Sequence, residues 1–358
     1  MKTLRHIVYL PLKILSILMA VALLLSYLSI YINPEKIWIP AFFGLFFLPL
    51  FLLNMLLSIA WLIIRHKTAW INICSLIPSL FYLPLFIQVH INNPAPTDTL
   101  HHIKIISYNV HLFGLLGKEK NMVTLPNIVE FIEKESPDIV CLQEISTFDT
   151  ASVNKAFRQY PYHHYHLNFR QNGAFFGIVT FSRYPITESG TFTFPNTSNR
   201  CSFADVVIKK KTIRVYNTHL QSVHINLEKT ALRLQQEELR NEEIRDVSGR
   251  LKSGFIKRAK QVNDITRHMD ASPFPIIVCG DFNDTPVSYT YRKMKGNRND
   301  CFTKAGSGII STYKSFWPAF RIDYIFSDKQ FEVAHYKIEK VTFSDHYPVV
   351  VELNIPKN

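Results

Sequence analysis

Side chains that can bind a cation or move a proton follow five apolar segments of the sequence. They are amide, carboxylate and imidazole groups: Asn109, Glu144, His219, Asp281 with Asn283, and Asp345 with His346. Carboxylate and amide oxygens suit a hard cation such as Mg²⁺, which also binds substrate phosphate. The two imidazoles are then available for proton transfer and for contact with a phosphate. The set favours a cation site that handles a phosphate group.

Each of these residues also has an ordinary explanation when taken alone. Asn109 could be a turn residue, and Glu144 could be the solvated end of a strand. Asp281 could belong to the start of a helix that continues into Asp284-Thr285-Pro286. Only their joint occurrence, each after an apolar run, favours a common site.

The elements that must position these side chains alternate between strands and helices. The predicted strands cover residues 103–109, 138–144, 175–181, 186–194, 203–208, 212–219, 275–279, 321–326 and 349–353. The predicted helices cover 127–134 and most of 227–270, with a break at Ser248-Gly249 or Ser253-Gly254, and Lys209-Lys210-Lys211 is predicted to form a hairpin tip. Hairpin-like strand pairs among helices predict a mixed sheet covered by helices. Sites in such α/β proteins lie at strand ends and in the loops that follow them.

The N-terminal quarter of the chain differs in composition, because it contains three long apolar stretches. Residues 8–32 contain one charged side chain, Lys13, and residues 37–64 and 69–89 contain none. A helix that crosses the bilayer core needs roughly 20 mostly apolar residues. All three stretches are long enough, so we expect a bundle of three transmembrane helices within residues 1–97. A cleaved signal peptide is the alternative for the first stretch, but that stretch exceeds the usual apolar run of roughly 7–15 residues.

The loop cations predict the orientation of this anchor. Lys2 and Arg5 precede the first stretch, and Arg65 and Lys67 lie between the second and third. The positive-inside rule therefore places the N-terminus in the cytoplasm. Three crossings then place the remainder on the periplasmic or extracellular side. Residues 90–100 are predicted to form a polar linker, and 98–358 to form the catalytic domain.

Composition limits the remaining possibilities. Apolar residues make up 47% of the 358 residues, which excludes a disordered chain. The first 97 residues contribute +5 to the formal charge of +12, so the remainder carries +7. That excess suits an anionic partner, either nucleic acid or anionic lipid headgroups. Five scattered cysteines without CxxC spacing argue against a zinc site and against a disulfide framework.

Seven short segments together resemble the endonuclease/exonuclease/phosphatase superfamily, also called deoxyribonuclease-I-like. They occur in the family's order and are Ser107-Tyr108-Asn109, Leu142-Gln143-Glu144, Phe181-Ser182-Arg183-Tyr184-Pro185-Ile186, Asn217-Thr218-His219-Leu220, Gly280-Asp281-Phe282-Asn283, Arg321-Ile322-Asp323-Tyr324-Ile325-Phe326 and Ser344-Asp345-His346-Tyr347-Pro348. The resemblance covers about residues 100–355. It implies a four-layer α/β sandwich of two packed mixed sheets flanked by helices, and metal-dependent cleavage of phosphoester bonds.

The resemblance also implies metal-binding and base roles for particular residues. Glu144 would bind Mg²⁺, or alternatively Mn²⁺, with Asn109 beside it, and Asp345 would help to hold this ion or a second one. His346 would be the general base that activates water, and Asp323 would orient its imidazole.

The remaining implied roles concern the phosphate. Asp281 and Asn283 would position the nucleophile and the phosphate oxygens, and His219 would donate a hydrogen bond or a proton to the phosphoryl group. Arg200 would be either a phosphate contact or a solvated loop residue.

The resemblance leaves the substrate open, because the superfamily contains nucleases, sphingomyelinases, inositol-phosphate phosphatases and deadenylases. The prediction is a Mg²⁺-dependent phosphodiesterase, in particular a membrane-tethered nuclease, with no obligate protein partner. The alternative is a sphingomyelinase-like or other enzyme directed at lipid or inositol phosphates, and a third possibility is a catalytically idle binding module. The aromatic segment 316–320 could stack on a base, insert into lipid or pack in the core.

Overall fold

The computed structural model describes residues 2–90, 100–114, 124–169, 173–223, 230, 233, 235–314 and 320–356. The predicted linker with its domain boundary, and most of the aromatic segment 316–320, lie outside these residues. The chain divides into two compact units that interleave in sequence. The first contains Met1–Phe86, Val223–Lys260 and Asp284–Arg292, and the second contains the rest.

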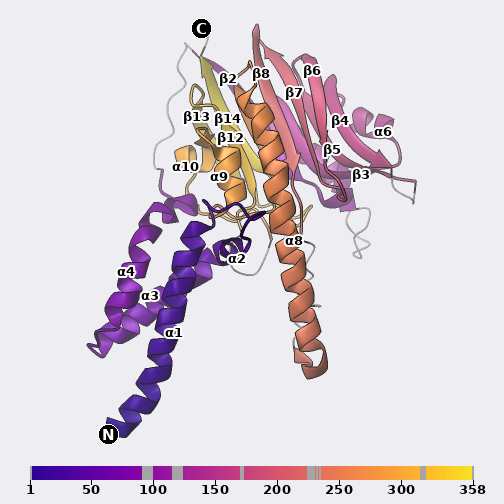
Figure 1. Cartoon of the computed structure of the whole chain (residues 1–358). Helices are drawn as coiled ribbons and strands as arrows, with labels where there is room; N and C mark the ends of the chain where they lie inside the picture. The colour runs from indigo at the N-terminus through magenta and orange to yellow at the C-terminus, as the bar shows by residue number, and fades with distance from the viewer. Residues whose placement is uncertain are drawn as a thin grey trace. The chain divides into compact units, whose positions relative to one another are not determined.

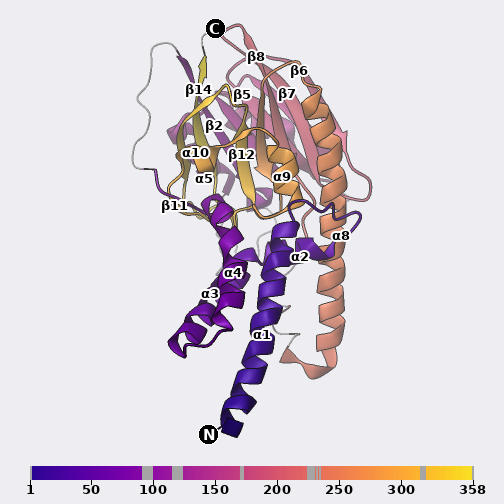
Figure 2. The same cartoon turned by 60° about the vertical axis from the view of Figure 1, so that its left-hand side comes forward.

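Apolar helices dominate the first unit. They are α1 (Lys2–Leu28), α2 (Ile39–Leu45), α3 (Phe47–Ile63) and α4 (Ala69–Leu76), followed by the 3-10 turns η1 (Ile77–Phe81) and η2 (Leu83–Leu85). Buried polar side chains join α1, α3 and α4: the Asn72 amide donates to the Asn54 side-chain oxygen (2.8 Å) and to the Ser16 carbonyl (3.2 Å), and the Trp61 indole donates to the Ser16 hydroxyl (2.8 Å). Figure 1 and Figure 2 show these helices gathered around α1.

The predicted bundle of three transmembrane helices is wrong. Among the described residues, one helix, Tyr9–Leu28, is long and apolar enough to cross a membrane, or two at most if the bent pair Ile39–Leu45 and Phe47–Ile63 counts as one span. That pair bends by 72°, next to Pro49, which has no amide hydrogen to continue the helical ladder. In residues 69–89, Pro78 and Pro84 fall in the two 3-10 turns that follow the short α4. A multi-pass topology is therefore not supported.

The second unit contains two six-stranded sheets. The first has the strand order β13-β14-β2-β3-β5-β4 and the second the order β10-β12-β9-β8-β7-β6, while β1 (Ile87–Gln88) and β11 (Gly308–Ile309) form a separate short pair. The strands are β2 (Leu100–Asn109), β3 (Ile139–Thr147), β4 (Tyr162–Phe169), β5 (Phe175–Ser182), β6 (Ile186–Thr193), β7 (Arg200–Ile208), β8 (Lys211–His219), β9 (Ile276–Asp281), β10 (Asn299–Asp300), β12 (Asp323–Ser327), β13 (Glu332–Ile338) and β14 (Val349–Pro356). The pairs β2–β3 and β8–β9 are parallel and the other pairs are antiparallel, so both sheets are mixed.

Alternating side chains pack the two sheets against each other. Ile103 and Ile105 of β2 and Val215 of β8 are fully buried in the shared core, together with residues of β3, β7, β9 and β14. The even-numbered residues Ile106 and Tyr108 of β2 point to the opposite face, where α5 (Thr124–Glu135) and α6 (Thr150–Ala156) cover them. This period of two is what a strand buried on both faces requires.

The outer face of the second sheet is covered by the C-terminal part of α8 (Glu237–Asp270). The His268 ring lies 4.8 Å from the ring of Phe203, and its Nδ1 is 2.7 Å from the Tyr216 hydroxyl. Figure 1 and Figure 2 both show this C-terminal part of α8 beside the sheet that contains β7 and β8. The order helix, sheet, sheet, helix confirms two mixed sheets flanked by helices.

Three local predictions can be compared directly with the structure. The hairpin tip is confirmed, since Lys209 and Lys210 connect β7 to β8 with positive φ values of 45° and 77°. The predicted break in the long helix is wrong, because α8 continues through Gly249 and Gly254. Burial of Leu251 and Phe255 against the N-terminal helices outweighs the low helix propensity of the two glycines. All five cysteines are free thiols.

Candidate active site

The ends of three strands bring Asn109, His219 and Asp281 together. These residues are the last of β2, β8 and β9, and all three are nearly fully buried. His219 lies directly opposite Asp281 in the parallel β8–β9 pair. The Asn109 amide donates to the Asp281 carboxylate at 3.0 Å, so the contact also bridges the two sheets.

Glu144 reaches the same place because β3 is irregular at this residue. The register of β3 against β5 shifts between Leu142 and Ile145, and Glu144 has a positive φ of 53°. A β-bulge of this kind redirects a side chain out of the normal alternation. The Glu144 carboxylate accepts from the Asn109 amide at 3.3 Å and lies 3.3 Å from His219 Nε2. Asn109 and His219 therefore each contact both carboxylates, Glu144 and Asp281.

The turn after β9 holds Asn283 over Asp281. Asn283 has a positive φ of 52°, its backbone amide donates to Asp281 Oδ1 at 2.8 Å, and its side chain donates to Asp281 Oδ2 at 3.1 Å. Gly280 makes this turn possible, since it has a φ of 137° and an added Cβ would lie 1.9 Å from the Thr218 carbonyl oxygen. Only glycine fits this close approach of β9 to β8.

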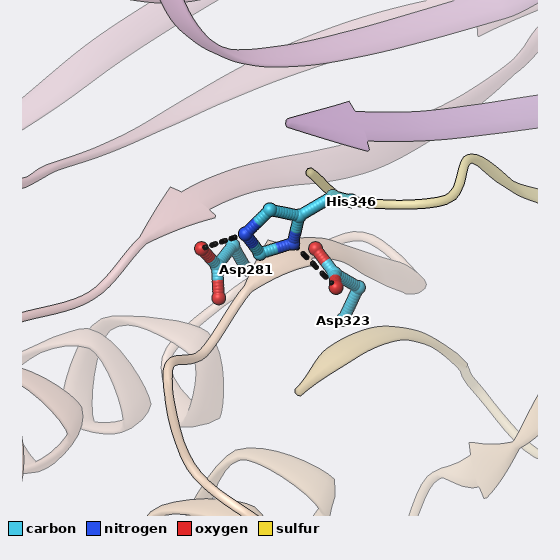
Figure 3. Close-up of side chains that lie close together, drawn as sticks. All are labelled: Asp281, Asp323 and His346. Atoms are coloured by element: carbon cyan, nitrogen blue, oxygen red, sulfur yellow. Dashed lines mark hydrogen bonds and ion pairs between the residues drawn. The ribbon is translucent and has the colours of Figure 1, made fainter. Parts of the chain in front are cut away.

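A second imidazole–carboxylate pair, His346 with Asp323, also contacts Asp281. His346 Nδ1 is 2.9 Å from Asp323 Oδ2, and His346 Nε2 is 3.8 Å from Asp281 Oδ2 (Figure 3). The second oxygen of Asp323 is buried without a hydrogen-bond partner among the described residues. Ligand atoms of Asp281, Asp323 and His346 lie within 4.8 Å of one another, so this group fits a cation, although it differs from the ligand set implied by the resemblance.

Electrostatic coupling sets the protonation of the site. Burial raises the pKa of Glu144, but the hydrogen bond and charge of His219 lower it to about 2, so this carboxylate is ionised. Burial raises the pKa of Asp281 to about 6, against the opposing effect of His346. Burial lowers the pKa of His346, but Asp323 and Asp281 raise it to about 10. A general base must be neutral, so that role requires additional positive charge beside these carboxylates.

Asp345 lies at the more exposed edge of the site. Its Oδ1 is 3.3 Å from His111 Nδ1 and accepts from the Ser344 hydroxyl at 3.2 Å. The same hydroxyl is 2.7 Å from the Asn109 carbonyl oxygen, which ties the Asp345 loop to the end of β2. The predicted metal-binding residues Asn109 and Asp345 are thus linked through Ser344.

Arg200 is not a solvated loop residue, which excludes that alternative. It is 4% exposed and is the first residue of β7, directly opposite His219 in the antiparallel pair. Side chains opposite each other in such a pair lie on the same face of the sheet. Its Nε is buried without a hydrogen-bond partner among the described residues. A buried cation with a free donor beside His219 is consistent with a phosphate contact.

Several residues support the site without having been predicted to do so. The Gln143 amide donates to the Asn217 side-chain oxygen at 2.8 Å and connects β3 to β8 between the sheets. The buried Thr312 hydroxyl accepts the backbone amides of Ile322 (2.9 Å) and Asp323 (3.0 Å), so it fixes the start of β12. Gln143 and Asn217 fall inside the motif segments, which is the only local signal. Nothing local distinguishes Thr312.

A buried histidine near Arg200 predicts how stability depends on pH. His166 of β4 is within hydrogen-bonding distance of the Cys201 carbonyl oxygen (3.1 Å), and burial lowers its pKa from 6.5 to about 4. The unfolded chain takes up this proton more readily, so the free energy of unfolding should fall as pH drops from 6.5 towards 4. The loss is on the order of 1–3 kcal/mol. Denaturant unfolding at both ends of this range measures it.

The control for this prediction replaces the titrating group. His166→Gln keeps a hydrogen-bond donor and should show a smaller loss of stability over the same pH range. His335→Gln on β13 should behave like the wild type. Equal losses in His166→Gln and in the wild type would contradict the assignment.

Comparison with known proteins agrees with this architecture. Residues 106–346 match the model of the endonuclease/exonuclease/phosphatase family, and residues 6–86 match a domain of unknown function. A comparison with curated proteins finds no match.

Several solved structures have the same fold. An endonuclease/exonuclease/phosphatase from Beutenbergia cavernae is 20% identical over 71% of this chain and 72% of its own, with a TM-score of 0.53. The human Nocturnin catalytic domain with bound sulfate is 19% identical over 73% of this chain and 99% of its own, with a TM-score of 0.52. A family protein from Bacteroides thetaiotaomicron is 19% identical over 72% and 98%, with a TM-score of 0.51. These similarities show the fold.

The family match covers well over half of the chain and includes every residue of the network described above. Family members hydrolyse phosphoester bonds and generally depend on divalent metal ions. The chain therefore belongs to the endonuclease/exonuclease/phosphatase family and is a phosphoester hydrolase.

Proposed function

We propose that this protein is a Mg²⁺-dependent phosphodiesterase, and specifically a nuclease attached to a membrane by α1. The observation that supports this most is the continuous polar network. Asp281 lies within 3.8 Å of both His219 Nε2 and His346 Nε2, and each imidazole has a second carboxylate, Glu144 or Asp323. Two oriented imidazoles around one carboxylate suit proton transfer at a phosphate group.

In this proposal the imidazoles and their partners carry out distinct steps. As water attacks phosphorus, His346 accepts its proton at Nε2, while Asp323 holds the imidazole through Nδ1 at 2.9 Å. The bond from phosphorus to the leaving oxygen breaks, and that oxygen takes up a proton from solvent. His219 donates to a non-bridging phosphate oxygen, and Arg200 offers its unpartnered Nε to the same group. Asp281 and Asn283 position the water and the phosphate between the two imidazoles.

The carboxylate and amide oxygens suit a hard divalent ion. Glu144, ionised at neutral pH, would hold it together with Asn109 and Asp345. Mg²⁺ favours such oxygen ligands and Mn²⁺ accepts them too. When bound, the ion supplies charge stabilisation to the phosphate oxygens. The unpartnered oxygen of Asp323 and its neighbour Asp281 offer a second place for positive charge.

Attachment to a membrane rests on α1. Residues Tyr9–Leu28 are long and apolar enough to cross a bilayer, and Ser16 within them bonds to α3 and α4. Those bonds favour a retained anchor over a cleaved signal sequence. Lys2 and Arg5 precede the apolar span Tyr9–Leu28, so one crossing places the N-terminus in the cytoplasm and the catalytic residues on the periplasmic or extracellular side. Protease accessibility of the C-terminal region in intact cells tests this orientation.

A second function keeps the same chemistry but changes the substrate. An apolar helix in the same chain would keep the enzyme near phospholipids, so lipid or inositol-phosphate headgroups are the alternative. The +7 charge of residues 98–358 is compatible with either anionic substrate.

The experiment uses the full chain in detergent with Mg²⁺. We expect it to nick supercoiled plasmid and to hydrolyse bis(4-nitrophenyl) phosphate. Hydrolysis of the small diester without nicking would favour lipid or inositol-phosphate substrates, which phospholipid vesicles then test. Absence of hydrolysis with every diester, in both Mg²⁺ and Mn²⁺, would overturn the proposal in favour of an idle binding module.

A further inference from the structure

The segment that directly follows Asn283 packs among the N-terminal helices. Residues Asp284–Arg292 belong to the same compact unit as α1–α4. Val287, at the centre of this segment, is completely buried in a cluster with Leu23, Tyr27, Phe47 and Phe86. The chain therefore passes from a candidate catalytic turn straight into a core formed by the helices.

Hydrogen bonds from side-chain hydroxyls to backbone carbonyl groups also hold this segment. The Ser29 hydroxyl of α1 is 2.7 Å from the Val287 carbonyl oxygen, and the Thr285 hydroxyl donates to the Gly44 carbonyl oxygen at 3.3 Å. A Cβ added to Gly44 would lie 2.4 Å from the Val287 carbonyl oxygen and 2.3 Å from the Ser29 hydroxyl. A real Cβ never comes this close, so the approach of α2 to the segment requires glycine.

A buried ion pair holds the beginning of the segment, one residue after Asn283. The Asp284 carboxylate is 3.1 Å from Arg258 Nε of α8, and it accepts from the Thr290 hydroxyl at 2.8 Å. The side chain of Arg258 is 1% exposed and that of Asp284 is 5% exposed. Because both charges are buried, losing either partner of the pair is strongly destabilising, so the pair fixes this point of the chain.

The other candidate catalytic strand, β8, leads into the same unit. Val223, four residues after His219, packs in the cluster of Ala41, Leu251 and Phe255. Two segments that carry site residues, one ending in His219 and the other in Asn283, thus continue directly into the core built on α1–α4 and α8.

We propose that the N-terminal helices are a positioning part of the active site, and that the contact of Gly44 and Ser29 with Val287 fixes the Asp281–Asn283 turn. The apolar N-terminal region would then be required for the geometry of catalysis as well as for attachment. This inference rests on the proposed roles of Asp281 and Asn283. Misplacing catalytic groups by about 1 Å can lower a rate about 10²-fold.

The test compares two glycines of the same unit in the full chain. Gly44→Ala pushes on Val287, whereas Gly249→Ala in α8 adds a methyl group where no atom lies within 4 Å. Hydrogen–deuterium exchange should increase in peptides covering 281–292 for Gly44→Ala only, while peptides of β2 and β14 stay unchanged. This readout needs no substrate, so it remains decisive if the proposed function fails.

Kinetics separate a positioning role from a loss of folded protein. We expect Gly44→Ala to raise the Mg²⁺ concentration for half-maximal diester hydrolysis by about 10-fold and to lower kcat, with Gly249→Ala unchanged. A smaller folded fraction would lower the apparent kcat and leave the Mg²⁺ requirement unchanged. Val287→Ala serves as a second variant if Gly44→Ala does not fold. Unchanged exchange in 281–292 for both Gly44→Ala and Val287→Ala would overturn the proposal.

Discussion

Replacing His346 with alanine is expected to lower the rate of phosphodiester hydrolysis by about 10²–10⁴-fold, the usual contribution of a general base. The imidazole is 5% exposed and is held between Asp323 at 2.9 Å and Asp281 at 3.8 Å. Among the described residues, the other imidazole in contact with Asp281 is His219, and it is paired with Glu144 at 3.3 Å. Initial rates on bis(4-nitrophenyl) phosphate at saturating Mg²⁺ measure the effect.

Two further variants test whether the loss of activity in His346→Ala comes from the loss of a general base. His335→Ala, on β13, removes a histidine outside the network and should leave the rate unchanged. Asp323→Asn keeps the shape of the partner but removes a charge that raises the pKa of His346. The His346 imidazole should therefore stay neutral down to a lower pH in Asp323→Asn than in the wild type. In the pH–rate profile, activity should persist to a correspondingly lower pH. A His346→Ala enzyme within about threefold of the wild-type rate would exclude the general-base role.

The strand-end positions of the candidate site could be predicted because their signals are local. Asn109, His219 and Asp281 each end a run of apolar residues, and such a run marks a buried strand whatever its partners are. Parallel pairing then carries the ends of β8 and β9 to one edge of the second sheet, and Asn109 reaches them from the end of β2 in the first sheet. The roles assigned to these residues remain predictions, since geometry alone does not show which group moves a proton.

Features that depend on long-range contacts could not be predicted in the same way. The positive φ of Glu144 and the β-bulge beside it arise from the pairing of β3 with β5. The residue type at this position does not predict either feature. The strand β4 was missed because three of its residues are histidines, which hide the apolar alternation of a strand. Likewise, burial of Leu251 and Phe255 keeps α8 continuous where two glycines suggested a break.

The N-terminal region shows the limit of reading length and hydropathy alone. Three stretches passed a length criterion, yet only α1 continues as one helix of that length. Proline at position 11 is accommodated within α1, whereas Pro49, Pro78 and Pro84 coincide with bends or 3-10 turns. Whether a proline interrupts a helix depends on what packs around the freed carbonyl group, which composition does not contain.

Glu144→Gln is expected to have the second large effect, lowering Mg²⁺-dependent hydrolysis by about 10³-fold. The carboxylate has a pKa of about 2, so at neutral pH the substitution removes a full negative charge while keeping the size of the side chain. Its Oε1 lies 3.3 Å from both the Asn109 amide and His219 Nε2. Rates and Mn²⁺ binding, measured by calorimetry on the full chain, report the change.

The dependence on metal concentration distinguishes two reasons for this loss. If Glu144 holds the cation, Glu144→Gln should bind Mn²⁺ more weakly, and a large excess of Mg²⁺ should restore part of the rate. If Glu144 instead serves only to keep His219 protonated and oriented, Mn²⁺ binding should be unchanged and excess Mg²⁺ should restore nothing. Glu130→Gln, exposed on α5, removes one carboxylate elsewhere and should match the wild type in both measurements. Asn109 and His219 contact both Glu144 and Asp281, so Glu144 lies at the centre of the polar network. We therefore expect weaker Mn²⁺ binding and partial rescue by Mg²⁺, because the lost charge lies where the phosphate is proposed to bind.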